Sequence, residues 1–322
     1  MRVALVLGSG GARGYAHIGV IDALHERGFE IVGISGSSMG ALVGALEAAG
    51  KLDEFTTWAS ALTQRTVLRL LDPSLTAAGV LRAEKILDAV REIIGPRTIE
   101  SLPIPYTAVT TDLIAGKSVW LQRGPVDSAI RASIAIPGVI APYLLDGRLL
   151  ADGGILDPLP MAPVAAVNAD LTIGVNLNAS DPTPTPDSPR PTAELLNRMR
   201  RSTTSLIDRA AASSLLDTPT ARMVLGRFSN AVDAIDPTLD PTLEAGEDSP
   251  VPRLGGFEVM NRTIEISQAA LMRHTLAAYP PDLLIDVPRT VCRSLEFYRA
   301  AEVIEVGNEL ACAALDSLGL KA

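Results

Sequence analysis

The order of structural elements in the first 50 residues constrains the fold most. Residues 2–7 and 30–35 are short aliphatic runs, which are typical of buried strands. Each run leads through a glycine-rich turn into a helical stretch, first an amphipathic one over residues 15–27 and then one that ends near Ala49. A glycine follows each helix, as is common at helix C-termini. The order strand, helix, strand, helix predicts the beginning of a parallel sheet.

The rest of the chain continues this α/β pattern. Hydrophobic periodicity and turn residues predict further strands at residues 106–112, 117–122, 148–151, 171–177 and 283–287, and helices at 53–62, 83–94 and 126–134. We therefore interpret residues 1–322 as a single domain. Two segments rich in Pro, Thr, Asp and Ser, near 178–191 and 236–252, are expected to form mobile loops or lids.

Composition and charge exclude several classes of protein. The chain has 47% hydrophobic and 20% charged residues, which is typical of a globular protein. Its formal net charge of −9 argues against nucleic acid as a partner, because phosphate binding needs a positive surface. No run approaches the roughly 20 apolar residues that span a bilayer. Arginines between Arg198 and Arg209 form either a solvated helix face or a lipid-docking surface.

The cysteines predict the compartment. Cys292 and Cys312 lack the spacing of a redox motif or a metal site, so we expect reduced thiols in a reducing compartment. No grouping of His and Cys has the spacing of metal ligands, and we expect neither a metal nor a cofactor. The sequence thus predicts a cytoplasmic protein that contacts the membrane peripherally, at the inner membrane face. It leaves the oligomeric state open.

A candidate nucleophile lies at the second strand-to-helix junction. Gly36, Ser38 and Gly40 match the GxSxG pattern, in which a serine occupies a sharp turn with its hydroxyl exposed. The two glycines remove side chains that would collide across such a turn. The helix that follows directs the positive end of its dipole at developing negative charge. Small residues also occur at ordinary junctions, so a purely structural turn is the alternative.

The first junction, residues 8–14 with the sequence GSGGARG, is also rich in glycine. A dinucleotide-binding loop would need glycine at Arg13 and an acidic residue after the second strand, and the sequence has neither. Consecutive backbone N–H groups before a helix can instead bind an anion, and beside Ser38 they would form an oxyanion hole. Arg13 would then hold the loop or bind an anionic headgroup.

Asp152 follows the strand at 148–151 and precedes two glycines. This pattern is either a simple turn or a base held at the sheet edge that carries Ser38. Three histidines are rival bases. His17 is the best placed of them, one turn after Arg13, whereas His25 and His274 lie at positions that favour other roles.

The three motifs, in this order and spacing, resemble the patatin-like phospholipases, especially the small bacterial proteins related to the catalytic domain of neuropathy target esterase. Residues 131–138, with the sequence RASIAIPG, are similar to the family's block ahead of the aspartate. The resemblance is strong over residues 1–177, weak over 178–281, and recovers over 282–307.

The resemblance implies a three-layer α/β/α patatin-like fold with a mostly parallel central sheet. It also implies a catalytic dyad of Ser38 and Asp152 and an oxyanion hole at Gly10 and Gly11. The implied reaction is calcium-independent hydrolysis of the fatty acyl esters of phospholipids or lysophospholipids. Residues that support the motifs are Gly8, Arg13, Gly14, Gly36, Gly40 and Gly153.

Two departures from the family pattern leave the choice of substrate open. Met39 stands where many members of the family have alanine, which would reshape the entrance for the acyl chain, and the middle of the chain matches no pattern that we can place.

Two other functions are alternatives to hydrolysis. An acyltransferase would use the same acyl-enzyme but pass the acyl group to an alcohol instead of water. A lipid-binding regulatory protein without catalytic activity could retain the same pocket.

Overall fold

The computed structural model divides the chain into two units, one of residues 1–181 with 265–322 and one of residues 182–264. The features discussed below belong to the first unit. Of the second unit, the structure describes the beginning of one helix. The residues that the structure describes are 1–70, 84–179 and 256–319.

Several predictions from the sequence lie outside the described residues. The predicted lid at 236–252 and the arginines from Arg198 to Arg209 are among them, as is the predicted lid at 178–191 except for its first two residues. Those two residues end a strand of the sheet. The single domain with two lids therefore stays a prediction.

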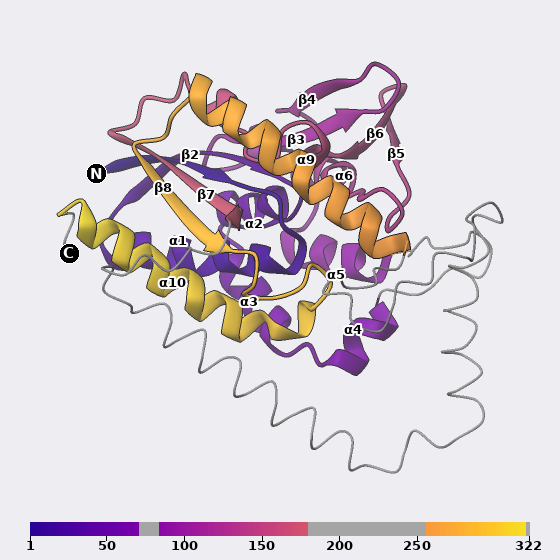
Figure 1. The fold of residues 1–322 in the computed structure, drawn as a ribbon, viewed down its shortest axis with the longest axis horizontal. Helices are drawn as coiled ribbons and strands as arrows, with labels where there is room; N and C mark the ends of the chain where they lie inside the picture. Colours follow the sequence, from indigo (N-terminus) through magenta and orange to yellow (C-terminus); the bar gives the residue numbers. More distant parts are fainter. Residues whose placement is uncertain (71–83, 180–255, 320–322) are drawn as a thin grey trace, which may run out of the picture. The chain divides into compact units, whose positions relative to one another are not determined.

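One sheet of eight strands organises the first unit (Figure 1). Its strands are β1 (Arg2–Leu7), β2 (Glu30–Ser37), β3 (Tyr106–Asp112), β4 (Lys117–Leu121), β5 (Tyr143–Leu145), β6 (Arg148–Asp152), β7 (Leu171–Ala179) and β8 (Leu283–Pro288). Hydrogen-bonded neighbours follow one another as β5-β6-β3-β2-β1-β7-β8, and β4 also pairs with β3. Strands β3, β2, β1, β7 and β8 are parallel, and β4, β5 and β6 join through antiparallel pairs. The mostly parallel sheet predicted from the sequence is confirmed.

Strand β3 brings the carboxyl ends of β2 and β6 together. Ser37, the last residue of β2, pairs with Val109, and Asp152, the last residue of β6, pairs with Thr110. Strand β4 pairs with residues 108–112 of β3. Because a strand has two edges, β2 and β6 must share the edge that β4 leaves. Their carboxyl ends therefore meet, and Asp152 lies next to the end of β2.

Helices lie on both faces of the sheet. They are α1 (Ala16–Glu26), α2 (Met39–Ala48), α3 (Leu52–Ser60), α4 (Gln64–Leu70), α5 (Glu84–Ile94), α6 (Val126–Ser133), α9 (Gly256–Ala278) and α10 (Ala300–Ser317). Short 3-10 turns are η1 (Gly11–Tyr15), η2 (Ile99–Ser101), η3 (Gly153–Ile155), η4 (Ala162–Val164) and η6 (Phe297–Arg299). Successive side chains of β1 face opposite ways. Ala4 and Val6 pack in one cluster with Met272 of α9, whereas Leu7 faces Gly44 of α2.

Helix α1 is more buried than the amphipathic pattern of residues 15–27 predicts. Helix α10 approaches it so closely that a Cβ atom on Gly19 would overlap the carbonyl oxygen of Ile304. A Cβ atom on Gly307 would likewise overlap the carbonyl oxygen of Ala16. Helix α10, far later in the chain, therefore covers the side of α1 that carries Ala16 and Gly19.

Strand β5 is not among the strands that the sequence predicts. It forms a hairpin with β6 through Asp146 and Gly147, which both have positive φ angles, of 49° and 73°. An Asp-Gly pair between two apolar runs is a strong signal for such a two-residue turn. Helix α4 was also not predicted.

Candidate active site

Ser38 occupies a strained turn between β2 and α2. Its φ and ψ angles are 57° and −122°, a combination that residues with a side chain rarely adopt. It is the single residue between the two elements, because β2 ends at Ser37 and α2 begins at Met39. The side chain is almost wholly covered, with 3% of its surface exposed.

The two flanking glycines are required by close backbone contacts. A Cβ atom on Gly36 would overlap the carbonyl oxygen of Gly40, across the turn. A Cβ atom on Gly40 would overlap the carbonyl oxygen of Leu7, at the end of the neighbouring strand β1. The steric role predicted for both glycines therefore agrees with the geometry.

Ser38 and Asp152 form a direct hydrogen bond. The Ser38 hydroxyl donates to Oδ2 of Asp152, and the Gly154 N–H donates to Oδ1 of the same carboxylate at 2.7 Å. Gly153 allows this approach, since a Cβ atom there would overlap the carbonyl oxygen of Val109 in β3. The Gly154 amide thus fixes one carboxylate oxygen, and the other oxygen faces the serine hydroxyl.

Burial changes the acidity of Asp152. Removal from water raises the pKa of its carboxyl group to about 6, while the hydrogen bonds from Ser38 and the Gly154 amide lower it. A carboxylate with this pKa is a better proton acceptor than an exposed aspartate, and it is still ionised at neutral pH. The site therefore contains a base that is matched to a neutral reaction medium.

The glycine-rich loop contains two backbone amides without a hydrogen-bond acceptor among the described residues. The amides of Ser9 and Ala12 are engaged, donating to the carbonyl oxygens of Pro158 at 2.8 Å and Ser294 at 2.9 Å. The amides between them, of Gly10 and Gly11, find no acceptor within residues 1–70, 84–179 and 256–319. Gly11 also lines the same pocket as Ser38. The arrangement suits an anion that develops beside the serine.

Arg13 supports the glycine-rich loop through a chain of hydrogen bonds. Its guanidinium group is buried and donates to Asn178 Oδ1 at 3.0 Å and to Glu265 Oε1 at 3.1 Å. The Asn178 side chain in turn donates to the carbonyl oxygen of Ser9 at 3.1 Å. Of the two roles that the sequence left open for Arg13, this geometry fits the support of the loop.

The three histidines lie in other environments. His17 is fully buried, and its Nε2 atom lies 2.8 Å from the carbonyl oxygen of Gly8, while burial lowers its pKa to about 4. His25 pairs with Glu47 at 3.0 Å, an interaction that raises the pKa of His25. His274 lies on an exposed part of α9. The hydrogen-bond partner of the Ser38 hydroxyl is Asp152.

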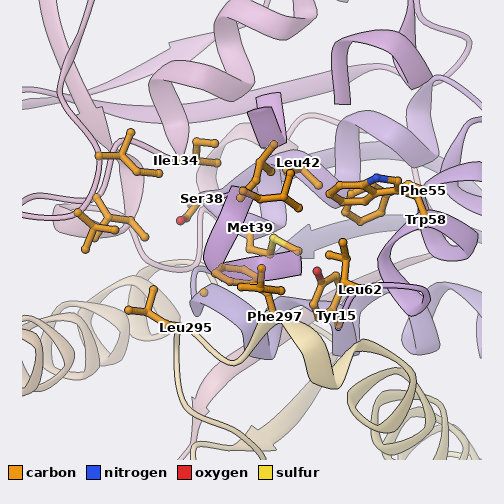
Figure 2. Close-up of a pocket in the computed structure, with 17 residues that line it drawn as sticks. Tyr15, Ser38, Met39, Leu42, Phe55, Trp58, Leu62, Ile134, Leu295 and Phe297 are labelled. Carbon is orange, nitrogen blue, oxygen red and sulfur yellow. The ribbon is translucent and has the colours of Figure 1, made fainter. Parts of the chain in front are cut away.

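An apolar pocket opens beside Ser38 (Figure 2) and holds about 770 Å³ of open space, its mouth included. In Figure 2, Ser38 lies to one side of Met39 and Leu42, and the rings of Phe55 and Trp58 lie beyond them. The other lining residues are Gly11, Tyr15, Leu62, Val67, Leu70, Ile86, Ile134, Ile136, Val139, Ile140, Leu295 and Phe297. Such a wall suits a hydrocarbon chain.

Aromatic side chains gather in this pocket although they make up only 4% of the sequence. The ring of Tyr15 lies 6.3 Å from that of Phe55 and 6.2 Å from that of Phe297. The rings of Phe55 and Trp58 are 5.6 Å apart. These four rings form a continuous wall, with Trp58 at one end of the series.

Met39, which departs from the family pattern, belongs to the same pocket. Its side chain is buried against Gly14, where a Cβ atom would overlap the Met39 side chain. Gly14 therefore makes room for Met39, and the methionine shapes the pocket next to the serine, as expected from the sequence.

Comparison with known proteins defines the class. A family model described as "Patatin-like phospholipase" matches residues 5–165, from β1 to the end of η4, including Ser38 and Asp152. The chain belongs to the patatin-like phospholipase family, and it is accordingly a lipid hydrolase.

Relatives within the family refine this assignment. The chain is similar to a protein from Mycobacterium tuberculosis described as an uncharacterized NTE family protein, with 68% identity over 98% of this chain and 92% of the relative. It is 33% identical to human patatin-like phospholipase domain-containing protein 6 over 56% of this chain, which is 14% of the human protein. The mouse patatin-like phospholipase domain-containing protein 7 matches to the same extent.

Within the described residues, no helix is both long and apolar enough to cross a membrane.

Proposed function

We propose that this protein hydrolyses fatty acyl esters of phospholipids or lysophospholipids with Ser38 as the nucleophile and Asp152 as the base. The observation that carries the proposal is the hydrogen bond from the Ser38 hydroxyl to Asp152 at the wall of an apolar pocket. A buried serine with an ionisable partner is an activated nucleophile, and the pocket suits the acyl part of a lipid.

In the first step the Ser38 oxygen attacks the ester carbonyl carbon while Asp152 accepts the hydroxyl proton. Negative charge develops on the carbonyl oxygen, and the amides of Gly10 and Gly11 stabilise it by donating hydrogen bonds. The bond to the alcohol oxygen then breaks, and protonated Asp152 returns the proton to this leaving group. The products are a free alcohol and an acyl-enzyme ester on Ser38.

In the second step water replaces the alcohol. Asp152 accepts a proton from the water molecule as its oxygen attacks the acyl carbon, and the same amides stabilise the oxyanion. The bond between the acyl group and Ser38 breaks, and the serine oxygen takes the proton back from Asp152. A fatty acid leaves and the dyad is restored.

We further infer that the enzyme works in the cytoplasm, with peripheral contact at the inner membrane face. The free thiols of Cys292 and Cys312 support a reducing compartment. A lipid substrate supports contact with a membrane, because long acyl chains are found there.

A panel of substrates tests this proposal. The protein is incubated with p-nitrophenyl esters of graded acyl length and with lysophosphatidylcholine, in parallel with Ser38→Ala as the matched control. We expect release of fatty acid by the parent chain and loss of that release in Ser38→Ala. Transfer of the acyl group to an added alcohol in preference to water would indicate an acyltransferase. Tight lipid binding without turnover in a folded sample would indicate a regulatory lipid-binding protein.

A further inference from the structure

A short segment after helix α6 contacts both members of the dyad. Ser133, the last residue of α6, is fully buried, and its hydroxyl oxygen accepts a hydrogen bond from the Ser38 backbone N–H at 2.9 Å. The same hydroxyl donates to the carbonyl oxygen of Val109 in β3 at 2.7 Å. Ser133 thus ties the backbone of the nucleophile to the strand on which the two catalytic strands meet.

The base is held by the same segment. The backbone N–H of Asp152 donates to the carbonyl oxygen of Ala135 at 2.9 Å. Ser38 and Asp152 lie on different strands, so their separation is not fixed by either strand alone. Residues 133–135 hold both backbones, which places the two side chains within hydrogen-bond distance of each other.

The residues between and after these contacts face the pocket. Ile134 and Ile136 are both part of the apolar lining (Figure 2). Consecutive residues of this segment therefore belong alternately to the support of the dyad and to the wall of the apolar pocket.

We propose that Ser133 is a positioning residue, which holds the strained Ser38 backbone in register with Asp152 through its two hydrogen bonds. The proposal rests on the hydrolase function proposed above. Without the Ser133 hydroxyl, the Ser38 N–H would lose its partner and the turn would lose its tie to β3. The serine hydroxyl would then spend less time aligned with the carboxylate, and a small misalignment is enough to slow a reaction strongly.

The test replaces Ser133 and separates turnover from binding. We expect Ser133→Ala to lower kcat about 10- to 100-fold, as for a misplaced catalytic group, with KM within about twofold of the parent value. The rate of inactivation by a fluorophosphonate should fall by a similar factor. Ser133→Cys, which retains a weak donor and acceptor, should lie between the parent and Ser133→Ala in both measurements.

Ser35 provides the matched control. It is also a fully buried serine, and its hydroxyl donates to the carbonyl oxygen of Pro160 at 2.5 Å, without contact to either member of the dyad. Like Ser133→Ala, Ser35→Ala removes a hydrogen bond from a buried hydroxyl to a backbone carbonyl oxygen, but it leaves the bond from the Ser38 N–H to Ser133 in place. We expect it to lower the melting temperature about as much as Ser133→Ala does, while kcat and the inactivation rate stay within about twofold.

Each outcome decides one claim. If folded Ser133→Ala behaves like Ser35→Ala in turnover and labelling, the positioning role is wrong. If Ser133→Ala does not fold, Ser133→Cys carries the test, and parent-like kcat and labelling in that variant would overturn the proposal. If Ser38→Ala retains the parent activity, the proposed hydrolase mechanism fails, whichever result the Ser133 variants give.

Discussion

The two glycine-rich junctions of the sheet, after β1 and after β2, lie side by side and yet serve different purposes. Both connect a buried parallel strand to a helical element, and both depend on glycine for close packing. The first, residues 8–14, presents the backbone amides of Gly10 and Gly11. The second, residues 36–40, presents one side chain, that of Ser38. In the proposed mechanism, the same topological unit would therefore supply hydrogen-bond donors in one case and a nucleophile in the other.

The difference lies in the backbone angles and in the neighbours of each turn. Ser38 has a positive φ angle although it is not glycine, a strained conformation at the turn whose hydroxyl bonds to Asp152. The first loop uses Gly11, with a φ angle of 58°, and keeps its amides free of internal partners within the described residues. Both turns contain similar residues. The function of each junction therefore depends on which atoms its backbone angles present to the site.

The largest expected effect concerns the second junction and its base. Asp152→Asn should lower turnover by roughly 10⁴-fold or more, because an amide cannot accept the serine proton. Asp157→Asn is the matched control. Burial also raises the pKa of Asp157 to about 6, but its side chain makes no contact with Ser38, so we expect parent-like turnover. Equal losses in both variants would contradict the assignment of the base.

The variant Asp152→Asn also has a predicted effect on stability. The pKa of Asp152 is higher in the folded chain, at about 6, than the ordinary value of 3.8. The folded chain therefore holds this proton more tightly, and stability is lost as pH rises from about 4 to 6. At pH 8, Asp152→Asn should raise the free energy of unfolding by an amount on the order of 3 kcal/mol, measured by urea denaturation. A less stable variant would contradict this.

The next effect concerns the first junction. Gly10→Ala should lower kcat about 100-fold, the loss expected for an oxyanion donor, because a Cβ atom would lie 2.6 Å from Leu177 Cβ and displace the amide. The same clash should also lower the melting temperature. Gly33→Ala, whose Cβ atom would lie 2.9 Å from the Val167 side chain, is the control for the clash alone. Turnover that falls equally in both variants would mean that the loop is not an oxyanion hole.

A smaller, graded effect is expected from pH. Because protonated Asp152 cannot accept the serine proton, kcat/KM should fall about tenfold per unit as the pH drops below about 6. The fall should persist in His25→Gln and His274→Gln. It should also persist in His17→Gln, since the pKa of His17 lies near 4. Disappearance of this limb, or a collapse of kcat, in one folded histidine variant would replace Asp152 with a histidine base.

The smallest effect concerns the aromatic wall. Trp58→Ala should shift the preferred acyl length toward longer chains, with about tenfold changes in kcat/KM between esters that differ across the limit. The chain's other tryptophan, Trp120, is 46% exposed and does not line this pocket, so Trp120→Ala serves as the control. A series of p-nitrophenyl esters measures both. An unchanged length profile in Trp58→Ala would show that the acyl chain does not reach this end of the pocket.

Much of the fold could be predicted from local patterns. The strands near residues 2–7 and 30–35 were predicted because their aliphatic runs and terminal glycines are local signals. Strand β5 was missed although Asp146-Gly147 signals a hairpin. The burial of α1 could not be predicted, because it depends on α10, which is distant in the sequence.

The site divides in the same way. The turn at Ser38 and the loop at residues 8–14 were predicted from their own residues. The adjacency of Ser38 and Asp152 came from resemblance to a family, since it depends on how β2 and β6 share one edge of β3. The contacts of Ser133 had no signal beyond a serine in a block similar to the family, because a hydrogen bond between distant residues depends on the packed fold.

Covalent labelling of the serine tests the central claim most directly. The protein is treated with a fluorophosphonate and digested, and the modified peptide is identified by mass spectrometry, with Asp152→Asn treated in parallel. The account predicts a single adduct on Ser38 in the parent chain and a strongly reduced labelling rate in Asp152→Asn, because the serine reacts only when its proton has an acceptor. An adduct on another hydroxyl, or labelling of Asp152→Asn at the parent rate, would contradict the dyad.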